Sequence, residues 1–331
     1  MLFRIAPALL AAVAVWFPGP ARAQEPALVV VEKIGSRVAF YTEDGRRVSG
    51  IEVGPAPHEM VFSPDRKFLY VSDNGILWMT EPGGGGNTIS VIDVKARKKA
   101  GVIDLGEYRR PHGLDVDPGT GRLVCTIENP DGLLLIDPAA RKVLRKYDVR
   151  GEDPHMVVLG PHGEYAYVSN TASGTVAAVH LPSGRVELIR VGARPQGGAL
   201  SPDGRLLYVT CEAGDSIAVI DTARRQRVGE IRTGKGPNRI GVTPDGATLV
   251  YSMEEGGGAV GFADAETRKQ TAMVKLAGRP LSLNLSPDGR LAYAGVQERD
   301  EIYVVSVPER KIVRVIRTPK GAGPDPVLPL P

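Results

Sequence analysis

Three of the five histidines follow a proline at one equivalent position of a repeated segment. They are His58, His112 and His155, and neutral imidazole nitrogens are common ligands of zinc, copper and iron. Three such ligands leave one coordination position open for water or a substrate. The pattern therefore predicts that these three histidines hold one divalent transition metal, with zinc, copper and iron as the candidates.

Two other interpretations of the histidines stay open. The histidine position lies on the same face of its expected strand as core residues such as Met60, two residues further on. The rings could therefore pack between repeats, each bonded to a carbonyl group. Without a metal, neutral imidazoles could also carry protons or donate hydrogen bonds to a ligand. If a metal is bound, Glu59 and Asp115 are expected to orient the rings through the second ring nitrogen.

The same position holds other polar residues in later copies of the segment. These are Gln196, Asn238 and Asp325, and Arg239 directly follows Asn238. Because equivalent positions of a closed repeat converge, we expect these four residues to bind a ligand beside the histidines. Arginine matches planar anions, so Arg239 would bind a carboxylate or phosphate group.

The repeated segment itself predicts the elements that position these residues. Residues 195–210 recur with clear similarity at 57–72, 111–126, 154–169, 237–252 and 280–295. A period of about 40–45 residues with strand-like content is typical of propeller blades. The 40 glycines and 27 prolines leave little room for long helices.

Each period is expected to contain four strands, with a Ser-Pro-Asp-Gly-type tight turn between the first two. Residues 27–33, 37–42 and 47–53 supply second, third and fourth strands but no first strand. The C-terminal residues from Pro324 supply a first strand and nothing after it. The sequence therefore predicts an all-β protein, a seven-bladed β-propeller with four antiparallel strands per blade. The C-terminal strand would join the N-terminal blade and close the ring.

The second strands carry a short motif that resembles a known family. Tyr208-Val209-Thr210 and Tyr167-Val168-Ser169-Asn170 resemble the YVTN family of seven-bladed propellers, within the wider group of lactonase-like and cytochrome d1-like propellers. The resemblance covers essentially the whole chain after residue 23. It implies the fold and an exported protein, with surface-layer proteins, binding proteins and companions of periplasmic redox enzymes among its members. Related lactonase-type propellers are enzymes, so fold alone does not decide the activity.

The first 23 residues have the features of a secretory signal peptide. Arg4 supplies a positive charge, an apolar run follows, and Ala21-Arg22-Ala23 is a small-x-small cleavage site. The run is too short to span a bilayer, and no later segment is long and apolar enough. We therefore expect cleavage after Ala23, one domain over residues 24–331, no transmembrane segment, and a monomer in the periplasm or outside the cell.

Charge and loop length suggest where a partner would bind. The loops after the second strands are rich in acids, whereas the turns after the third strands are rich in bases, so one end of the ring, here called the top, is expected to be acidic. A small ligand or periplasmic protein would bind this acidic top face. The basic turns lack interleaved aromatic residues, and the net charge is only +3, which argues against nucleic acid.

Residues 74–86 form the one long insertion, which contains Trp78 and a run of glycines. We expect a flap over the channel, or a docking knob for a partner, with Trp78 in contact with the ligand. The alternative is that the loop folds against a neighbouring blade.

Two functions follow from these features. The first is an exported binding protein that takes a ligand or metal at the top mouth of the channel, as an accessory to a periplasmic redox system. The alternative is a metal-dependent enzyme, a lyase, lactone hydrolase or oxidase, that uses the same histidines.

Overall fold

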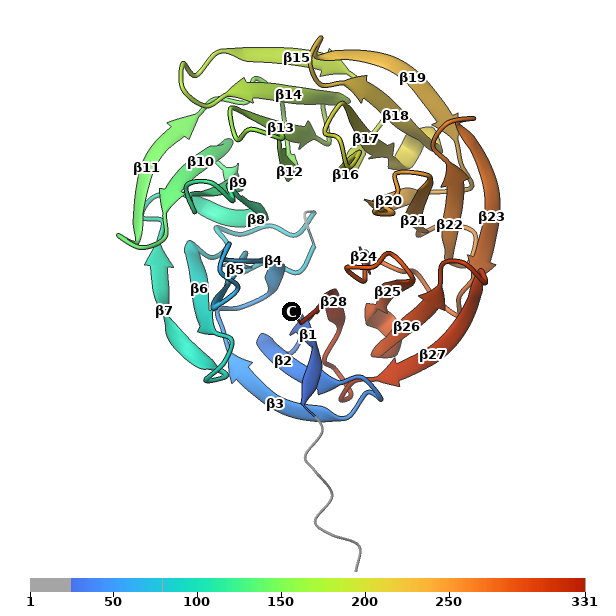
Figure 1. Ribbon diagram of the computed structural model, residues 1–331. Helices are drawn as coiled ribbons and strands as arrows, with labels where there is room; N and C mark the ends of the chain where they lie inside the picture. Colours follow the sequence, from blue (N-terminus) through green and yellow to red (C-terminus); the bar gives the residue numbers. More distant parts are fainter. Residues whose placement is uncertain (1–24, 79, 331) are drawn as a thin grey trace, which may run out of the picture.

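The computed structural model describes residues 25–78 and 80–330, and within them seven four-stranded sheets form a ring (Figure 1). This confirms the predicted all-β propeller. The proposed signal peptide, residues 1–23, lies outside the described residues. No helix among the described residues is long and apolar enough to cross a membrane.

Blades 1 to 6 are formed in sequence order, each from four antiparallel strands that run from the channel outward. The strands of blade 1 are β4 (Pro57–Phe62), β5 (Phe68–Asp73), β6 (Thr88–Asp93) and β7 (Lys98–Asp104). Those of blade 2 are β8 (Arg109–Val116), β9 (Leu123–Asn129), β10 (Asp131–Asp137) and β11 (Lys142–Tyr147). Those of blade 3 are β12 (Pro154–Leu159), β13 (Tyr165–Asn170), β14 (Thr175–His180) and β15 (Val186–Arg190).

The next three blades follow the same plan, and two of them carry a short 3-10 helix after the second strand. Blade 4 contains β16 (Pro195–Leu200), β17 (Leu206–Cys211), η1 (Glu212–Gly214), β18 (Ser216–Asp221) and β19 (Gln226–Arg232). Blade 5 contains β20 (Pro237–Val242), β21 (Thr248–Met253), β22 (Ala259–Asp264) and β23 (Lys269–Lys275). Blade 6 contains β24 (Ser282–Leu285), β25 (Leu291–Val296), η2 (Gln297–Arg299), β26 (Glu301–Ser306) and β27 (Lys311–Arg317).

Blade 7 joins the two ends of the described chain. It consists of β1 (Pro26–Glu32), β2 (Arg37–Thr42), β3 (Arg47–Glu52) and the C-terminal strand β28 (Pro324–Pro329). β28 pairs antiparallel with β1, with Val327 opposite Val30 and Leu328 opposite Val29. The prediction that the C-terminal strand closes the ring is therefore confirmed, and β28 lies beside β1 in Figure 1.

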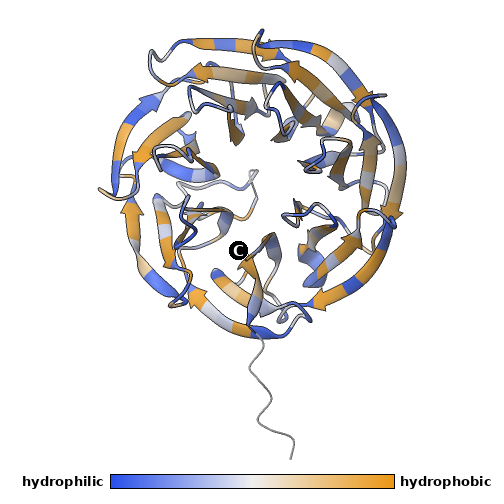
Figure 2. Ribbon diagram, viewed as in Figure 1, coloured by the Kyte–Doolittle hydropathy of each residue, from blue (hydrophilic) through white to orange (hydrophobic). Residues whose placement is uncertain are grey.

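The hydrophobic core lies between neighbouring blades. Between blades 7 and 1, for example, Phe40 of β2 packs in one cluster with Met60 of β4 and Leu69 of β5. The outermost strands alternate hydrophilic and hydrophobic residues, as Figure 2 shows, because one face of each is exposed and the other packs on the neighbouring blade. Cys125 and Cys211 are buried free thiols.

Candidate functional site

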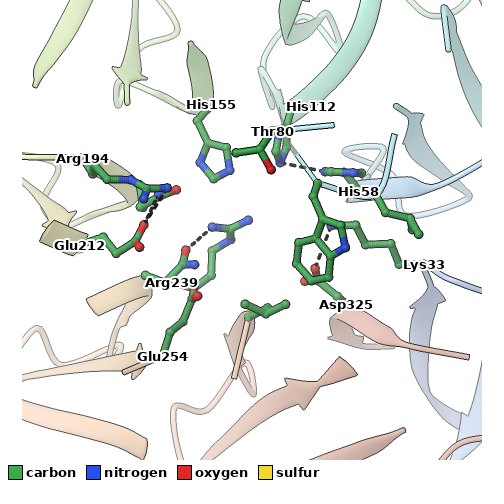
Figure 3. Close-up of a pocket in the computed structure, with 15 residues that line it drawn as sticks. Lys33, His58, Thr80, His112, His155, Arg194, Glu212, Arg239, Glu254 and Asp325 are labelled. Carbon is green, nitrogen blue, oxygen red and sulfur yellow. Dashed lines mark hydrogen bonds and ion pairs between the residues drawn. The ribbon is translucent and has the colours of Figure 1, made fainter. Parts of the chain in front are cut away.

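All seven residues that follow the repeat proline line one pocket at the top of the channel. The pocket has a volume of about 190 Å³. The seven are buried to similar extents, with exposed fractions between 3% and 9%. They are His58, His112, His155, Gln196, Asn238, Leu281 and Asp325. Each lies within the first four residues of an innermost strand or, for Leu281, directly before one, so the repeat brings seven distant positions to one pocket, whose lining side chains are drawn in Figure 3.

The three histidines lie in contact with one another. The ring centroids of His58 and His112 are 4.4 Å apart, and those of His112 and His155 are 4.1 Å apart. Nδ1 of His58 lies 3.1 Å from Nε2 of His112. This convergence on one edge of the pocket is what the sequence-based prediction of a common site requires.

The hydrogen-bond partners fix where the protons lie in this group. Nε2 of His58 is 2.7 Å from the carbonyl oxygen of Ile76, which can only accept, so Nε2 carries the proton and Nδ1 is the acceptor. Nε2 of His112 must then donate to His58. This leaves Nδ1 of His112 facing Oε1 of Glu128 at 2.7 Å, and one further proton is shared between those two atoms.

Burial and nearby positive charge keep the histidines neutral. Burial lowers the pKa of His58 well below its usual value, and the positive charge of Lys33 lowers it further. The pKa values of His112 and His155 are lowered in the same way. Burial also raises the pKa of Glu128 to about 7, which suits a carboxyl group that shares a proton with His112. Neutral imidazole is the form that binds metals.

Two buried polar atoms in this pocket have no hydrogen-bond partner among the described residues. They are Nδ1 of His155 and Oδ1 of Asp325. The other oxygen of Asp325 accepts a hydrogen bond from Gln297 at 2.5 Å and lies 3.5 Å from Nζ of Lys33. Buried polar atoms in native proteins are usually paired, so two unpaired atoms in one pocket indicate a place for a ligand group or bound water.

The residues expected to orient the histidines are not the ones that do so. Glu59 bonds to Arg239 at 2.7 Å, and Asp115 accepts the backbone N–H of Leu159 at 2.8 Å. Glu59 lies next to His58, but its carboxyl group reaches from blade 1 to Arg239 of blade 5, and Asp115 lies three residues along β8 from His112. Glu128, at the far end of β9, occupies the orienting position instead.

The other predicted ligand residues also reach the pocket. Arg239 lies with its side chain 12% exposed, held by Glu59 and by a hydrogen bond to Asn238. Nε2 of Gln196 donates to Glu212 at 2.5 Å. Sequence reasoning did not single out Lys33 or Glu254, which also line the pocket. Both directly follow a second strand, and this place in the repeat was the signal that could have identified them.

The inserted loop covers part of the channel mouth. Leu77, Trp78 and Thr80 line the pocket, and the loop after β5 extends toward the centre of the ring in Figure 1. Trp78 is 41% exposed, and its ring lies 5.7 Å from Nζ of Lys33. The hydrogen bond from His58 to the carbonyl group of Ile76 fixes the loop to the histidine group.

Several acids of the top face are paired with bases. The predicted acidic surface is therefore partly compensated within residues 25–78 and 80–330. The pairs are Glu128 with Arg110 at 2.8 Å, Glu212 with Arg194 at 3.6 Å, Asp215 with Lys235 at 2.5 Å, and Glu298 with Arg279 at 3.9 Å. Arg194, Lys235 and Arg279 come from the loops between blades, and Arg110 comes from the start of β8, so none of these bases belongs to a loop after a second strand.

No cluster of three or more histidine, cysteine or acidic side chains within the described part of the chain has the arrangement of a preformed metal site. The nitrogens of His58 and His112 are turned to each other and to their orienting partners. What the arrangement offers is a group of neutral imidazoles beside buried cations and acids, which can bind ions or polar ligands.

The fold and this pocket define the class of the protein, a seven-bladed β-propeller with a polar pocket at one end of its central channel. No family model matches the sequence. The chain is similar to protein NirF of Pseudomonas aeruginosa, with 29% identity over 214 residues. That match covers 60% of this chain and 54% of NirF, so the matched part spans about half the length of NirF.

Two solved structures share the fold. A functionally unknown protein from Desulfotomaculum acetoxidans has a TM-score of 0.76 at 16% identity, over 92% of this chain and 99% of that chain. Dihydro-heme d1 dehydrogenase NirN in complex with DHE has a TM-score of 0.67 at 15% identity, over 95% of this chain and 78% of that chain. Identities this low show a common fold, and the YVTN family name stays a prediction.

Proposed function

We propose that this protein is an exported β-propeller that binds a ligand at the top mouth of its channel through His58, His112 and His155. The observation that carries the proposal is the contact of the three rings in one pocket, where Nδ1 of His155 is buried without a partner. Rings that served packing alone would be expected to have their buried nitrogens paired. Export follows from the predicted signal peptide at residues 1–23.

A divalent transition metal fits these donors, with zinc, copper and iron as candidates. Nitrogen ligands at 2.0–2.1 Å from a tetrahedral ion lie roughly 3.3 Å apart. Nδ1 of His58 and Nε2 of His112, 3.1 Å apart, need little movement to face one ion after the proton between them leaves. The carbonyl group of Ile76 and the carboxylate of Glu128 would then accept the N–H groups of the two rings, as the orienting partners of metal-bound histidines usually do.

A calorimetric titration of the mature chain with zinc, copper(II) and iron(II) tests this proposal. We expect one ion per chain, and a loss of affinity of about 100-fold or more in His112→Ala. His162→Ala is the matched control, because His162 is an exposed residue in a turn at the other end of the ring. If none of the three ions binds, or if the two variants behave alike, the histidine site is wrong.

Fluorescence gives a second readout at the same place. The chain has two tryptophans, and Trp16 lies within the predicted signal peptide, so Trp78 would be the only one in the mature protein. A ligand that enters the pocket lined by Trp78 should change its emission. NirN is described as a dihydro-heme d1 dehydrogenase in complex with DHE, so an iron-bearing tetrapyrrole belongs beside the bare metals in this assay. Binding of such a ligand would support a role beside a periplasmic redox system.

One observation favours the alternative of a metal-dependent lyase, lactone hydrolase or oxidase. Glu254 lines the pocket, and its carboxyl group forms no hydrogen bond or ion pair within the described residues. Burial, and the charge of Glu212, raise the pKa of Glu254 to about 7, which is suited to a general acid or base near neutral pH. Turnover of a lactone by metal-loaded protein that falls at least 100-fold in Glu254→Gln would support this function, and the absence of turnover would contradict it.

A further inference from the structure

Two buried cations lie in the same pocket as the histidines. The side chain of Lys33 is 7% exposed and that of Arg239 is 12% exposed. In Figure 3 the guanidinium group of Arg239 points into the middle of the pocket, and Lys33 lies beside Asp325. Buried cations on this scale are uncommon in proteins unless they are paired or serve a ligand.

These two charges line the same pocket as the three histidines. A buried positive charge disfavours a bare metal ion nearby, because Coulomb repulsion is strong at short range. A metal bound here therefore needs negative charge between itself and the cations.

Both cations keep N–H donors that no group in the described part of the chain accepts. A guanidinium group has five N–H donors, and Arg239 donates to Glu59 and Asn238. Lys33 has one carboxylate partner, Asp325, at 3.5 Å. Glu59 and Asn238 also hold Arg239 in one orientation, so a ligand bound by its remaining donors would find a preformed partner. Guanidinium groups match the planar, bidentate shape of a carboxylate.

The charge of the site agrees with an ion pair as the ligand. The pocket and the groups paired with it contain four cations, Lys33, Arg110, Arg194 and Arg239, and five acids, Glu59, Glu128, Glu212, Glu254 and Asp325. A divalent ion alone would leave this group with a net positive charge. The negative charge of one monocarboxylate would offset this positive charge.

The size of the pocket limits the partner. Its volume of about 190 Å³ is below the 300–1,000 Å³ typical of sites for drug-sized ligands. An ion and a small carboxylate fit within such a volume. Trp78 and Leu77 would cover the carboxylate, since both residues line the mouth.

We propose that the pocket takes a divalent transition metal together with a small carboxylate, which bridges the metal at the histidines to Arg239 and Lys33. This inference rests on the proposed metal-binding function and adds the chemical class of the second ligand. Each ligand should then increase the affinity of the other by the same factor, because binding linkage is reciprocal.

Zinc titrations with and without acetate test the bridge, because acetate hardly complexes zinc in solution. In the wild-type protein, acetate should increase zinc affinity by about tenfold, within the usual range of coupling between sites. The double variant Glu59→Gln/Arg239→Gln removes the buried cation together with its partner, so that no unpaired charge is left. In this variant acetate should change zinc affinity by less than about twofold, and zinc alone should bind at least as tightly as in the wild type.

Arg205→Gln is the matched control, because the side chain of Arg205 is 86% exposed at the other end of the ring and should leave the acetate effect unchanged. X-ray absorption of the zinc-loaded wild type needs no variant, and it should show an added oxygen ligand at about 2.0–2.2 Å when acetate is present. Zinc binding that acetate does not change, with no added oxygen, overturns the bridge but leaves the metal site standing. If zinc does not bind with or without acetate, both proposals fail.

Discussion

The two halves of the channel mouth use one strand position for different purposes. In blades 1 to 3 the position holds histidines whose rings contact one another, with centroids 4.1 and 4.4 Å apart. In blades 4 and 5 it holds Gln196 and Asn238, which bind charged side chains, Glu212 and Arg239. The backbone repeats around the ring, but the chemistry does not.

This difference makes the two sides of the pocket chemically distinct. One half offers imidazole nitrogen donors, and the other half offers fixed charges for an oxygen ligand. Asp325 of blade 7 lies between the halves and is paired with Lys33 at 3.5 Å. A symmetric ring of identical residues would bind a ligand on its axis, whereas this mouth can bind the two ends of a ligand differently.

The largest expected effect concerns the strand that joins the two halves. Deletion of residues 321–331 removes β28, which carries Asp325 and the fully buried Val327. Each large buried side chain that is lost costs roughly 2–5 kcal/mol, and the edge of β1 becomes exposed. We expect loss of cooperative melting, measured by calorimetry and circular dichroism. Removal of residue 331 alone is the control, and unchanged melting of the long deletion would refute closure by β28.

A smaller effect is expected at Glu254, in the charged half. Its pKa is raised to about 7 by burial, so between about pH 4.5 and 7 the folded protein binds a proton that the unfolded chain has released. Stability therefore decreases as the pH rises through this window. Glu254→Gln lacks this penalty. Its free energy of unfolding should exceed that of the wild type by on the order of 1 kcal/mol above pH 7, and the two should be equal near pH 4.

Denaturant unfolding of both proteins between pH 4 and 8 would measure this difference. The control is Glu255→Gln, which changes the exposed next residue. Parallel stability profiles for Glu254→Gln and the wild type would mean that Glu254 is not held in its neutral form. Glu254 would then no longer distinguish the charged half of the mouth from the histidine half.

The smallest effect is expected at Trp78, which lines the mouth of the pocket on the inserted loop. Trp78→Ala removes a side chain that is 41% exposed, so the free energy of unfolding should change by less than about 0.5 kcal/mol. Zinc should leave the site severalfold faster, because an open mouth mainly raises the dissociation rate. Release into a chelator in stopped flow measures this rate. Trp78→Phe should behave as the wild type does, and equal rates in all three proteins would show that the loop does not cover the ligand.

The sequence alone determined the ring of blades and the position of the site at the top mouth of the channel. The proline-led repeat predicted seven blades, the joining of the two termini, and the convergence of seven positions that now line one pocket. These features are local and periodic. Strand alternation sets which way each side chain points, and closure of the ring brings equivalent positions together, so neither needs knowledge of distant contacts.

Only the tertiary structure decided the partners of each group. Glu128 and the carbonyl group of Ile76 orient the histidines in place of Glu59 and Asp115, and Lys33 enters the pocket beside Asp325. The inserted loop lines the mouth, and several acids of the top face are paired with bases. The physical reason is that these contacts join different strands and blades. They depend on the exact positions of long side chains and on loop conformation, which no repeat in the sequence encodes.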